Sequence, residues 1–396
     1  YKPLYKLKNM LSVEEALKKI QEIEVELFTK EILLKDSNGY VLASDVISPI
    51  NMPPFEQSAM DGFAIANLDS LEFQIIGKIK AGDSIQSEIR EFQAIKIFTG
   101  AAIPRGTVAV IPIEKCKIKN QKLILLELPK YNENIRPIGE QIQSGNLALK
   151  RGIQITPPAI GFLSCLGITH VSVYKKPSIG IVITGNELID PGIELTFGKI
   201  YESNGIMLQS ALTNYTEEIN VYKVQDDQEL TTNSIQKAML YHDIILISGG
   251  ISVGDYDFVY DALQELNVET LFYKVNQKPG KPLYVGLKDS KIVYALPGNP
   301  AASLSCYYIY VLPIIKKMQG QVPNTFMKAT LAHDYVVKNS RTQFLKAYYD
   351  GEKVTILSHQ NSNMLNTFAL ANILVKIEAG EYKIKSNSIV DIYHIN

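Results

Sequence analysis

The sequence predicts a multidomain fold that combines a parallel α/β domain with β-rich domains. Three observations predict this class. Short β-like runs separated by turn residues fill residues 46–136, apolar runs alternate with helical patterns over residues 176–318, and β-like runs without long helical patterns follow residue 323. At roughly 150 residues per domain, the 396 residues suffice for about two to four domains with their own hydrophobic cores.

An amphipathic helix is predicted over residues 12–28. Ser12 is the expected N-cap, and Glu15 three residues later completes a capping box. Apolar residues recur at helical spacing at Val13, Ala16, Leu17, Ile20, Ile23 and Leu27. One face of this helix is therefore expected to pack against a core.

A small all-β module is predicted over residues 46–136. Its runs FQIIGKI, AIKIF, VAVIPI and KLILLEL are separated by Gly, Pro and Asp residues that favour turns. Residues 139–170 then become polar and later helical, with Pro157 and Pro158 at the expected first turn of a helix.

Residues 176–318 predict a parallel sheet. The apolar runs IGIVIT, INVYKV, DIILIS and KIVYAL are each followed by a helical stretch, near residues 205–213, 227–241, 256–266 and 300–318. Strands that alternate with helices in this way form parallel sheets with right-handed crossovers. The β-like runs after residue 323, about seventy residues in all, predict a compact C-terminal β domain.

The composition excludes several classes of protein. The 40 Lys and Arg residues against 41 Asp and Glu residues give a formal net charge of -1, whereas domains that bind duplex nucleic acid are usually basic. We therefore expect no nucleic acid partner. No apolar run reaches the roughly 20 residues that span a bilayer, and the first residues lack the pattern of a signal peptide. We expect a cytoplasmic protein without a membrane partner.

Cysteine and histidine are too dispersed for a thiolate or imidazole metal site. Cys116, Cys165 and Cys306 lie far apart, and the five histidines lack the close spacing of zinc ligands. Any bound metal is therefore expected to be a hard cation on carboxylate ligands.

Candidate ligand-binding residues lie in the loops that follow the predicted parallel strands, because such loops meet at one edge of an open sheet. The segment at residues 248–254 contains three glycines and two serines, so its backbone amides can approach an anion such as phosphate. The GxGxxG and Walker patterns are absent, and a glycine-rich turn before a capped helix is an equally good interpretation of this segment alone.

Lysines and carboxylates accompany this loop. The segment KPGKP at residues 278–282 has a restricted backbone and two cations suited to a doubly charged anion, although alone it also fits a solvated turn. The nearby acids are Glu187, Asp226, Asp227, Asp255 and Asp257. Carboxylates facing phosphate and lysine suggest a magnesium ion, whereas any one of these acids alone is more often an N-cap or a solvated charge.

The motifs taken together resemble the MoeA family of molybdopterin molybdenumtransferases. They are, in chain order, PPFEQSAMDGFA, IFTGAAIPRGTVAVIP, IRPIGEQIQSG, VITGNEL, ISGGISVGDYD, KPGKP and ALPGNPAAS. The animal relative in this family is the E domain of gephyrin. The resemblance covers essentially the whole chain.

The resemblance implies a fold of four domains and a homodimer. A discontinuous elongated domain that mediates dimerisation would comprise residues 1–48 and 139–174, with a small β domain inserted at residues 49–138. A MogA-like α/β domain that binds molybdopterin would span residues 175–323, and a C-terminal β-barrel-like domain residues 324–396. The active site would lie between the α/β domain of one subunit and the inserted β domain of the other.

The resemblance also implies an activity. Family members hydrolyse adenylylated molybdopterin with Mg²⁺ and insert molybdate into the dithiolene, giving molybdenum cofactor and AMP. The substrates would thus be adenylylated molybdopterin and molybdate, with Mg²⁺ as cofactor. A MogA-like adenylyltransferase and molybdoenzyme apoproteins would be the protein partners.

Site residues carry over motif by motif. The catalytic positions would be Asp61, Thr99, Glu187, Asp227 and Asp257. The metal ligands would be Glu187, Asp226 and Asp257, and the resemblance leaves open whether Asp226 or Asp227 is the acid after the second strand. The positions that would bind substrate are Ser248, Gly249, Gly250, Ser252, Gly254, Asp255, Lys278, Lys281, Pro282, Pro297, Asn299, Pro300, Arg341 and Ser362.

Four positions depart from the family pattern. Gln141 and Asn186 stand where acids are usual, Phe63 replaces a frequent tyrosine, and Lys346 replaces a common arginine. An amide ligates Mg²⁺ more weakly than a carboxylate, so Gln141→Asp is expected to raise Mg²⁺ affinity. The alternatives to an insertase are a MogA-like molybdopterin adenylyltransferase and a non-catalytic, gephyrin-like scaffold.

Overall fold

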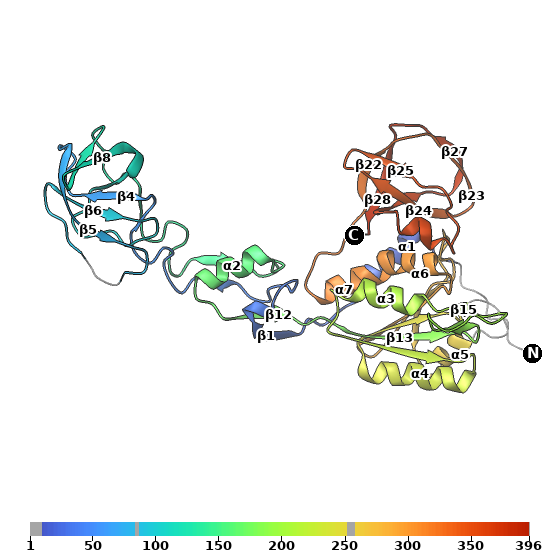
Figure 1. The fold of residues 1–396 in the computed structure, drawn as a ribbon. Helices are drawn as coiled ribbons and strands as arrows, with labels where there is room; N and C mark the ends of the chain where they lie inside the picture. The colour runs from blue at the N-terminus through green and yellow to red at the C-terminus, as the bar shows by residue number, and fades with distance from the viewer. Residues whose placement is uncertain (1–9, 84–86, 252–257, 396) are drawn as a thin grey trace, which may run out of the picture. The chain divides into compact units, whose positions relative to one another are not determined.

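The computed structural model describes residues 10–83, 87–251 and 258–395. These residues divide into two compact units. We call Glu31–Val173 the insert unit, and Tyr1–Lys30 together with Tyr174–Asn396 the main unit. Figure 1 shows the ribbon of both units, coloured by residue number from blue at the N-terminus to red at the C-terminus.

The insert unit contains a mainly antiparallel sheet with strand order β7-β4-β6-β5-β9-β8. These strands are β4 (Gly62–Ile65), β5 (Glu72–Ile79), β6 (Gln93–Ile97), β7 (Ala109–Pro112), β8 (Cys116–Lys119) and β9 (Lys122–Leu125). Both faces of the central strand β4 are buried: Phe63 and Ile65 pack into one apolar cluster and Ala64 into another. The predicted all-β character of this segment is confirmed.

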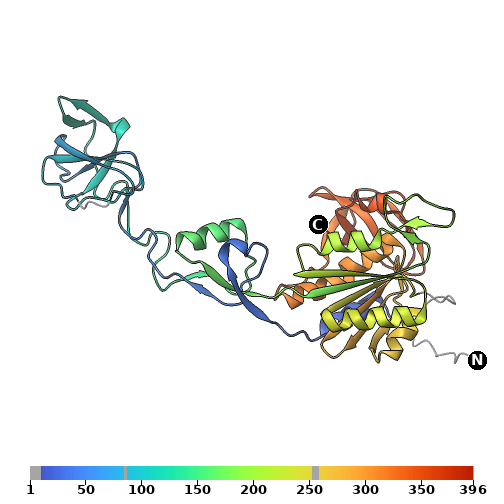
Figure 2. The same cartoon turned by 60° about the horizontal axis from the view of Figure 1, so that its bottom comes forward.

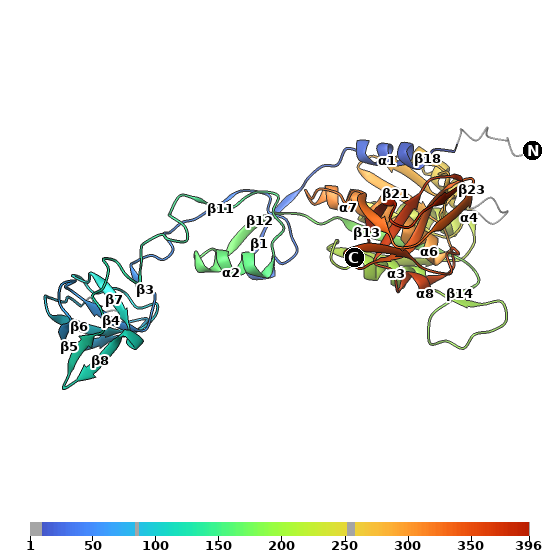
Figure 3. The ribbon, with the colours of Figure 1, turned by 90° about the horizontal axis from the view of Figure 1, so that it is seen from above.

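The rest of the insert unit is built from strand pairs and one helix packed around Leu34, Leu42 and Leu163. The pairs are β1 (Thr29–Leu33) with β12 (His170–Tyr174), β2 (Val46–Ile47) with β11 (Leu147–Leu149), and β3 (Gln57–Ser58) with β10 (Ile135–Arg136). Helix α2 (Pro157–Cys165) begins at the predicted proline pair. Figure 3 labels α2, β1, β3, β11 and β12 among these elements.

The main unit is organised around a sheet with strand order β16-β13-β17-β21-β20-β18. Its strands are β13 (Ser178–Thr184), β16 (Glu218–Val224), β17 (Ile244–Ser248), β18 (Glu269–Tyr273), β20 (Tyr284–Lys288) and β21 (Lys291–Leu296). The first four in spatial order run parallel, as predicted, and correspond to the four predicted apolar runs. In register, Thr184 lies opposite Val224 and Ser248 opposite Leu296, so these strands end at a common edge.

Helices cover both faces of this sheet (Figure 2). Buried apolar side chains of α4 (Gln228–Tyr241) and α5 (Phe258–Glu265) pack against one face of the sheet. The other face packs against α1 (Val13–Glu22), α3 (Asn204–Leu212), α6 (Pro300–Cys306) and α7 (Leu312–Met318), with a π-helical segment η3 (Tyr307–Val311) joining the last two. Among the described residues, no helix is both long enough and apolar enough to cross a bilayer.

The C-terminal part of the main unit is a closed β-barrel. Strands β24, β25, β22, β28 and β26 pair in that order, and β26 pairs back to β24. Their bounds are β22 (Met327–Leu331), β24 (Thr342–Tyr349), β25 (Lys353–Ile356), β26 (Ile373–Ile377) and β28 (Ile389–His394). Beside them lie β23 (Tyr335–Asn339) paired with β27 (Gly380–Ile384), and α8 (Leu365–Phe368). The predicted barrel-like character is confirmed.

The structure corrects the expected N-terminal helix. The predicted capping box is present, since Ser12 Oγ accepts from Glu15 N at 3.1 Å and Ser12 N donates to Glu15 Oε2 at 2.8 Å. The helix, however, ends at Glu22 rather than continuing to residue 28. Beyond Ile23 apolar and polar residues alternate with period two, which favours extended chain leading into β1.

The sheet also has an antiparallel edge that the sequence pattern did not predict. Strand β20 runs antiparallel to β21, and β18 runs antiparallel to β20. The segment between β18 and β20 carries KPGKP and forms β19 (Gln277–Lys278), which pairs with β24 of the barrel. The lysine loop is therefore held between the α/β sheet and the barrel.

Candidate active site

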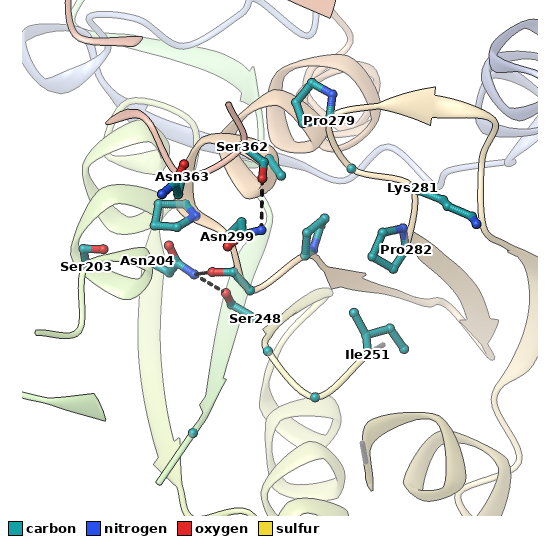
Figure 4. Close-up of a pocket in the computed structure, with 18 of the residues that line it drawn as sticks. Ser203, Asn204, Ser248, Ile251, Pro279, Lys281, Pro282, Asn299, Ser362 and Asn363 are labelled. Atoms are coloured by element: carbon teal, nitrogen blue, oxygen red, sulfur yellow. Dashed lines mark hydrogen bonds between the residues drawn. The ribbon is translucent and has the colours of Figure 1, made fainter. Parts of the chain in front are cut away.

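A pocket of about 1320 Å³ lies at the carboxyl edge of the parallel strands of the main unit. Because the strand order reverses direction across β13, the loops after β13 and β17 diverge and leave a crevice between them. The lining comprises residues 183–188, 200–204, 226, 248–251, 277–282, 297–300, 302, 339–341, 361–363 and 365. Loops far apart in the sequence thus meet in one cavity (Figure 4).

The glycine-rich loop after β17 requires its glycines. Gly249 has φ +96°, and a Cβ there would lie 2.6 Å from the carbonyl oxygen of Thr184. Gly250 has φ +58°, and its Cβ would lie 2.8 Å from Val259 Cγ2. A residue with a side chain would be strained in both backbone conformation and space. The loop therefore follows a path, next to the pocket, that only glycine takes without strain.

Asn204, at the start of α3, joins two of the pocket loops. Its Nδ2 donates to Ser248 Oγ at 2.8 Å and to the carbonyl oxygen of Gly298 at 2.7 Å (Figure 4). Sequence reasoning missed this residue. The signal available was its position: Asn204 begins the helix that follows the first parallel strand, so it had to lie at the same edge as the predicted loops.

The acid side of the pocket carries Glu187 and Asp226. Asp226 accepts from the backbone N–H of Asn186 at 3.0 Å, and Asn186 Oδ1 accepts from Asp226 N at 3.1 Å, so the two loops hold each other. Asp227 lies outside the pocket lining, and its Oδ1 instead caps α4 by accepting from Leu230 N at 2.9 Å. The structure thus places Asp226, and not the predicted catalytic Asp227, at the cavity.

The cation side of the pocket carries Lys278, Lys281 and Arg341, with Pro282 beside them. Lys278 belongs to β19, whose partners on β24 are Thr342 and Gln343. This pairing sets Lys278 close to Arg341, although sixty-three positions separate them in the chain. Three cations from two regions of the sequence therefore line the same cavity, and such groups suit a small oxyanion.

The loop after β21 completes the lining with Pro297, Asn299 and Pro300. Asn299 Nδ2 donates to Ser362 Oγ at 3.0 Å, and Ser362 O accepts from Ala302 N at 3.3 Å. These two hydrogen bonds connect Ser362, one of the residues predicted to bind substrate, to the start of α6. Pro300 occupies the first turn of α6, as its sequence position predicted.

Lys346 supports the loop that carries Ser362. Its ammonium group is buried, and it donates to the carbonyl oxygens of His359, Asn361 and Met364 at 3.1–3.2 Å. Burial lowers the pKa of this lysine. The sequence marked Lys346 only as a departure from the family pattern, and the structure gives it a supporting role below the pocket.

Asp61 and Thr99 lie in the insert unit, at the ends of β4 and β6. The backbone N–H and the hydroxyl of Thr99 donate to Asp61 Oδ1 at 2.8 and 2.7 Å. These two bonds, with a smaller contribution from Lys96, hold the pKa of the Asp61 carboxyl below its usual value. Asp61 therefore keeps its negative charge, and Thr99 fixes its orientation. Gln141 is also in this unit and is exposed.

Four predicted residues, Ser252, Gly254, Asp255 and Asp257, lie outside the described residues. Within the described ranges, no three His, Cys, Asp or Glu side chains come together as a metal site. Ser248, Gly249, Gly250 and the other described positions predicted to bind substrate all line the pocket.

Three family models match successive parts of the chain. Residues 11–167 match the MoeA N-terminal region (domain I and II), residues 180–317 a probable molybdopterin binding domain, and residues 328–395 the MoeA C-terminal region (domain IV). The matches follow one another in the order expected from the motifs.

Similar proteins match over nearly their full length. A molybdopterin molybdenumtransferase of Staphylococcus epidermidis is 34% identical over 96% of this chain and 95% of its own. One from Staphylococcus aureus is 33% identical over 97% and 96%. The crystal structure of the molybdopterin biosynthesis MoeA protein from Pyrococcus horikoshii OT3 matches with a TM-score of 0.81 at 28% identity, covering 98% of this chain and 100% of that chain. The predicted multidomain fold class is confirmed.

Proposed function

The chain belongs to the MoeA family of molybdenum cofactor biosynthesis proteins, and on this premise we propose that it is a molybdopterin molybdenumtransferase. Its substrates are adenylylated molybdopterin and molybdate, and its products are molybdenum cofactor and AMP. The observation that carries the proposal is the pocket, in which Lys278, Lys281 and Arg341 share one cavity with a glycine-rich loop and with carboxylates.

The cation side fits molybdate. Molybdate is a tetrahedral dianion, and lysine, arginine and backbone N–H groups are the donors that hold such anions. We assign it to Lys278 and Lys281, with Arg341 and Ser362 closing the site from the barrel part. Lys278 is in β19, Arg341 directly precedes its partner strand β24, and Ser362 lies between β25 and α8.

The glycine loop and the acid side fit the adenylated end of the pterin. The backbone at Gly249 and Gly250 is free of side chains and lines the cavity, so phosphate oxygens can approach it closely. Asn204 connects this loop to the loop after β21, because its Nδ2 donates to Ser248 Oγ and to Gly298 O. Hydrolysis of the phosphoanhydride bond depends mainly on such positioning and on neutralisation of charge.

Glu187 and Asp226 fit a magnesium ion of the kind bound together with substrate. Mg²⁺ is usually held by one or two carboxylates plus phosphate oxygens and waters, so an all-protein cage is not required. When bound there, Mg²⁺ would neutralise charge that develops on the phosphoryl oxygens. Asp257 is a third proposed ligand from the sequence. The remaining work falls to this chain's own residues, which bind and orient the two substrates.

We propose further that the working enzyme is a homodimer in which Asp61 and Thr99 of one copy serve the pocket of the other. The resemblance to the MoeA family supports this proposal, because the motifs of Asp61 and Thr99 lie in the insert unit and the motifs that line the pocket lie in the main unit. The proposed domains are residues 1–48 with 139–174, 49–138, 175–323 and 324–396. A MogA-like adenylyltransferase as supplier and molybdoenzyme apoproteins as acceptors are the proposed protein partners.

The test is AMP release from adenylylated molybdopterin with Mg²⁺, with and without molybdate, followed by assay of the molybdenum-loaded pterin. We expect molybdate-dependent turnover that falls by about 100-fold or more in Asp61→Ala, the usual cost of losing an acid near the reacting groups. Asp69→Ala, which changes another exposed acid of the insert unit, is the matched control and should retain activity.

Other outcomes would identify the alternatives. Formation of the adenylate from ATP and molybdopterin would indicate an adenylyltransferase. Binding of the adenylated pterin without turnover under any condition would indicate a scaffold. Either result would overturn the proposed function.

A further inference from the structure

A buried polar cluster lies directly below the KPGKP loop. Its members are Gln277, Cys306 and Tyr310, all fully buried. The Tyr310 hydroxyl donates to Gln277 Oε1, and Gln277 Nε2 donates to Gly280 O at 3.2 Å and to Cys306 Sγ at 3.5 Å. Both ends of the glutamine amide are therefore engaged, and one of its partners is the backbone of the lysine loop itself.

The lysine loop is closed tightly onto this cluster. Gly280, between the two lysines, has φ +85°, and a Cβ there would lie 2.5 Å from Cys306 Sγ and 2.9 Å from Gln277 Nε2. Lys281 O accepts from the backbone N–H groups of Val275 at 3.0 Å and Leu283 at 3.1 Å. The backbone on which both lysines are mounted is thus fixed from below, while Lys278 is exposed and Lys281 half-buried at the pocket.

Tyr310 reaches the cluster from an irregular segment of helix. It belongs to the π-helical segment η3, between α6 and α7. π-Helical turns within α-helices are frequently found at functional sites. The carbonyl oxygen of Tyr310 also accepts from the Tyr294 hydroxyl at 3.1 Å, which fixes the backbone of this turn.

We propose that Gln277 and Tyr310 are positioning residues that fix the two lysines for the oxyanion substrate. This inference rests on the proposed function, since it takes molybdate as the anion. Burying an amide costs free energy unless its hydrogen bonds are satisfied. Here the Tyr310 hydroxyl and the carbonyl oxygen of Gly280, in the lysine loop, satisfy the amide of Gln277. A preorganised loop binds without first losing conformational freedom, so loosening it costs affinity.

The test compares two tyrosine variants on the same segment. Tyr310→Phe removes the donor to Gln277. Tyr307→Phe removes an equally buried hydroxyl whose acceptor, Ala211 O at 2.9 Å, is in α3 and away from the loop. We expect the KM for molybdate in the AMP-release reaction to rise about fivefold in Tyr310→Phe, with kcat at saturating molybdate within about twofold of wild type. Tyr307→Phe should leave both unchanged.

A double variant separates positioning from stability. Gln277→Met with Tyr310→Phe replaces both partners by apolar groups, so stability should return toward that of the wild type. Gln277→Met also removes the hydrogen bond from Gln277 Nε2 to Gly280 O, so the KM for molybdate should stay raised. Two results would overturn the positioning role. In the first, the double variant recovers both the wild-type melting temperature and the wild-type KM for molybdate. In the second, the KM for molybdate does not rise in Tyr310→Phe.

Failure of the proposed function gives a different result. Calorimetric titration of the wild-type protein with sodium molybdate should show binding, and the wild type should release AMP. If the wild type does both and the variants match it, only the positioning role is wrong. If the wild type neither binds molybdate nor releases AMP, both the proposed function and the positioning role are wrong.

Discussion

The two sides of the pocket are supported in different ways. On the cation side, Lys278 and Lys281 are mounted on a backbone held by a buried cluster and by pairing of β19 with β24. On the acid side, Glu187 is exposed, and the Asn186–Asp226 bonds join two surface loops. The backbone that carries the lysines is thus fixed by buried contacts, whereas the carboxylates lie on exposed loops held mainly by each other.

The largest expected effect is on the cation side. Lys281→Ala should weaken molybdate binding by about 10-fold to 100-fold, because a hydrogen bond to a charged group contributes about 1.5–3 kcal/mol. Calorimetric titration with molybdate measures it, and Lys353→Ala, which changes an exposed barrel lysine, is the control. An unchanged Kd in Lys281→Ala would remove the lysine loop from anion binding.

The glycine loop tests whether backbone shape is as important as charge. Gly249→Ala combines a positive φ with a contact of 2.6 Å to a backbone oxygen. Gly192 has the same φ of +96° but open space around it, so Gly192→Ala carries the backbone strain alone. We expect Gly192→Ala to destabilise by about 1–2 kcal/mol and Gly249→Ala by more, with additional loss of pterin binding. Equal melting temperatures for the two variants would contradict the close approach at Gly249.

On the acid side, rate and not anion affinity should change. Glu187→Gln is expected to lower the rate of AMP release by about tenfold and to require more Mg²⁺ for half-maximal rate, because an amide is a weaker ligand than a carboxylate. The Kd for molybdate should stay within about twofold. Glu194→Gln, in the exposed segment that follows, is the control. A large rise in the molybdate Kd of Glu187→Gln would show that the two sides are not separable.

The smallest expected effect concerns the Thr99 hydroxyl, which donates to the Asp61 carboxylate in the insert unit. The pKa of Asp61 is lower than that of an ordinary aspartate, chiefly because Thr99 N–H donates to the carboxylate and secondarily because the Thr99 hydroxyl does. The stabilisation of the carboxylate is therefore present above the unfolded pKa and is lost as the pH falls through the lowered folded pKa. Thr99→Val keeps the backbone bond and should raise the pKa of Asp61 only part of the way toward that of an ordinary aspartate.

Carbon NMR of labelled aspartate carboxyls, assigned with Asp61→Asn, measures this shift. Thr107→Val removes a hydroxyl that donates to Pro104 O, so it should leave the Asp61 pKa unchanged. A Thr99→Val protein whose Asp61 titrates as in the wild type would show that the hydroxyl bond contributes nothing.

Local patterns in the sequence predicted much of the fold. Capping chemistry at Ser12, the proline pair at the start of α2, and apolar runs followed by helices are each encoded within about twenty residues. The antiparallel strands β18 and β20 were missed because they flank the KPGKP loop and pair only within the assembled sheet. The early end of α1 was missed because apolar residues continue beyond Glu22 with a different period.

The site was predicted where chemistry lies in contiguous motifs. The glycine loop and KPGKP are visible as sequence, and the described part of each lines the pocket. Asn204, Lys346 and the Gln277–Tyr310 pair act through tertiary contacts, so the sequence did not predict the hydrogen bonds that they make. Only the structure shows that Asp226 lines the pocket and that Asp227 caps α4 instead. The two aspartates are adjacent, and the sequence does not indicate which of them is the N-cap.

The most direct test of this account is a titration of molybdate into the wild-type protein, Lys281→Ala and Glu187→Gln under one set of conditions. We expect the wild type and Glu187→Gln to bind molybdate with a similar Kd, and Lys281→Ala to bind it at least about tenfold more weakly. Equal weakening in both variants, or none in either, would contradict the division of the pocket into a preformed anion side and an acid side.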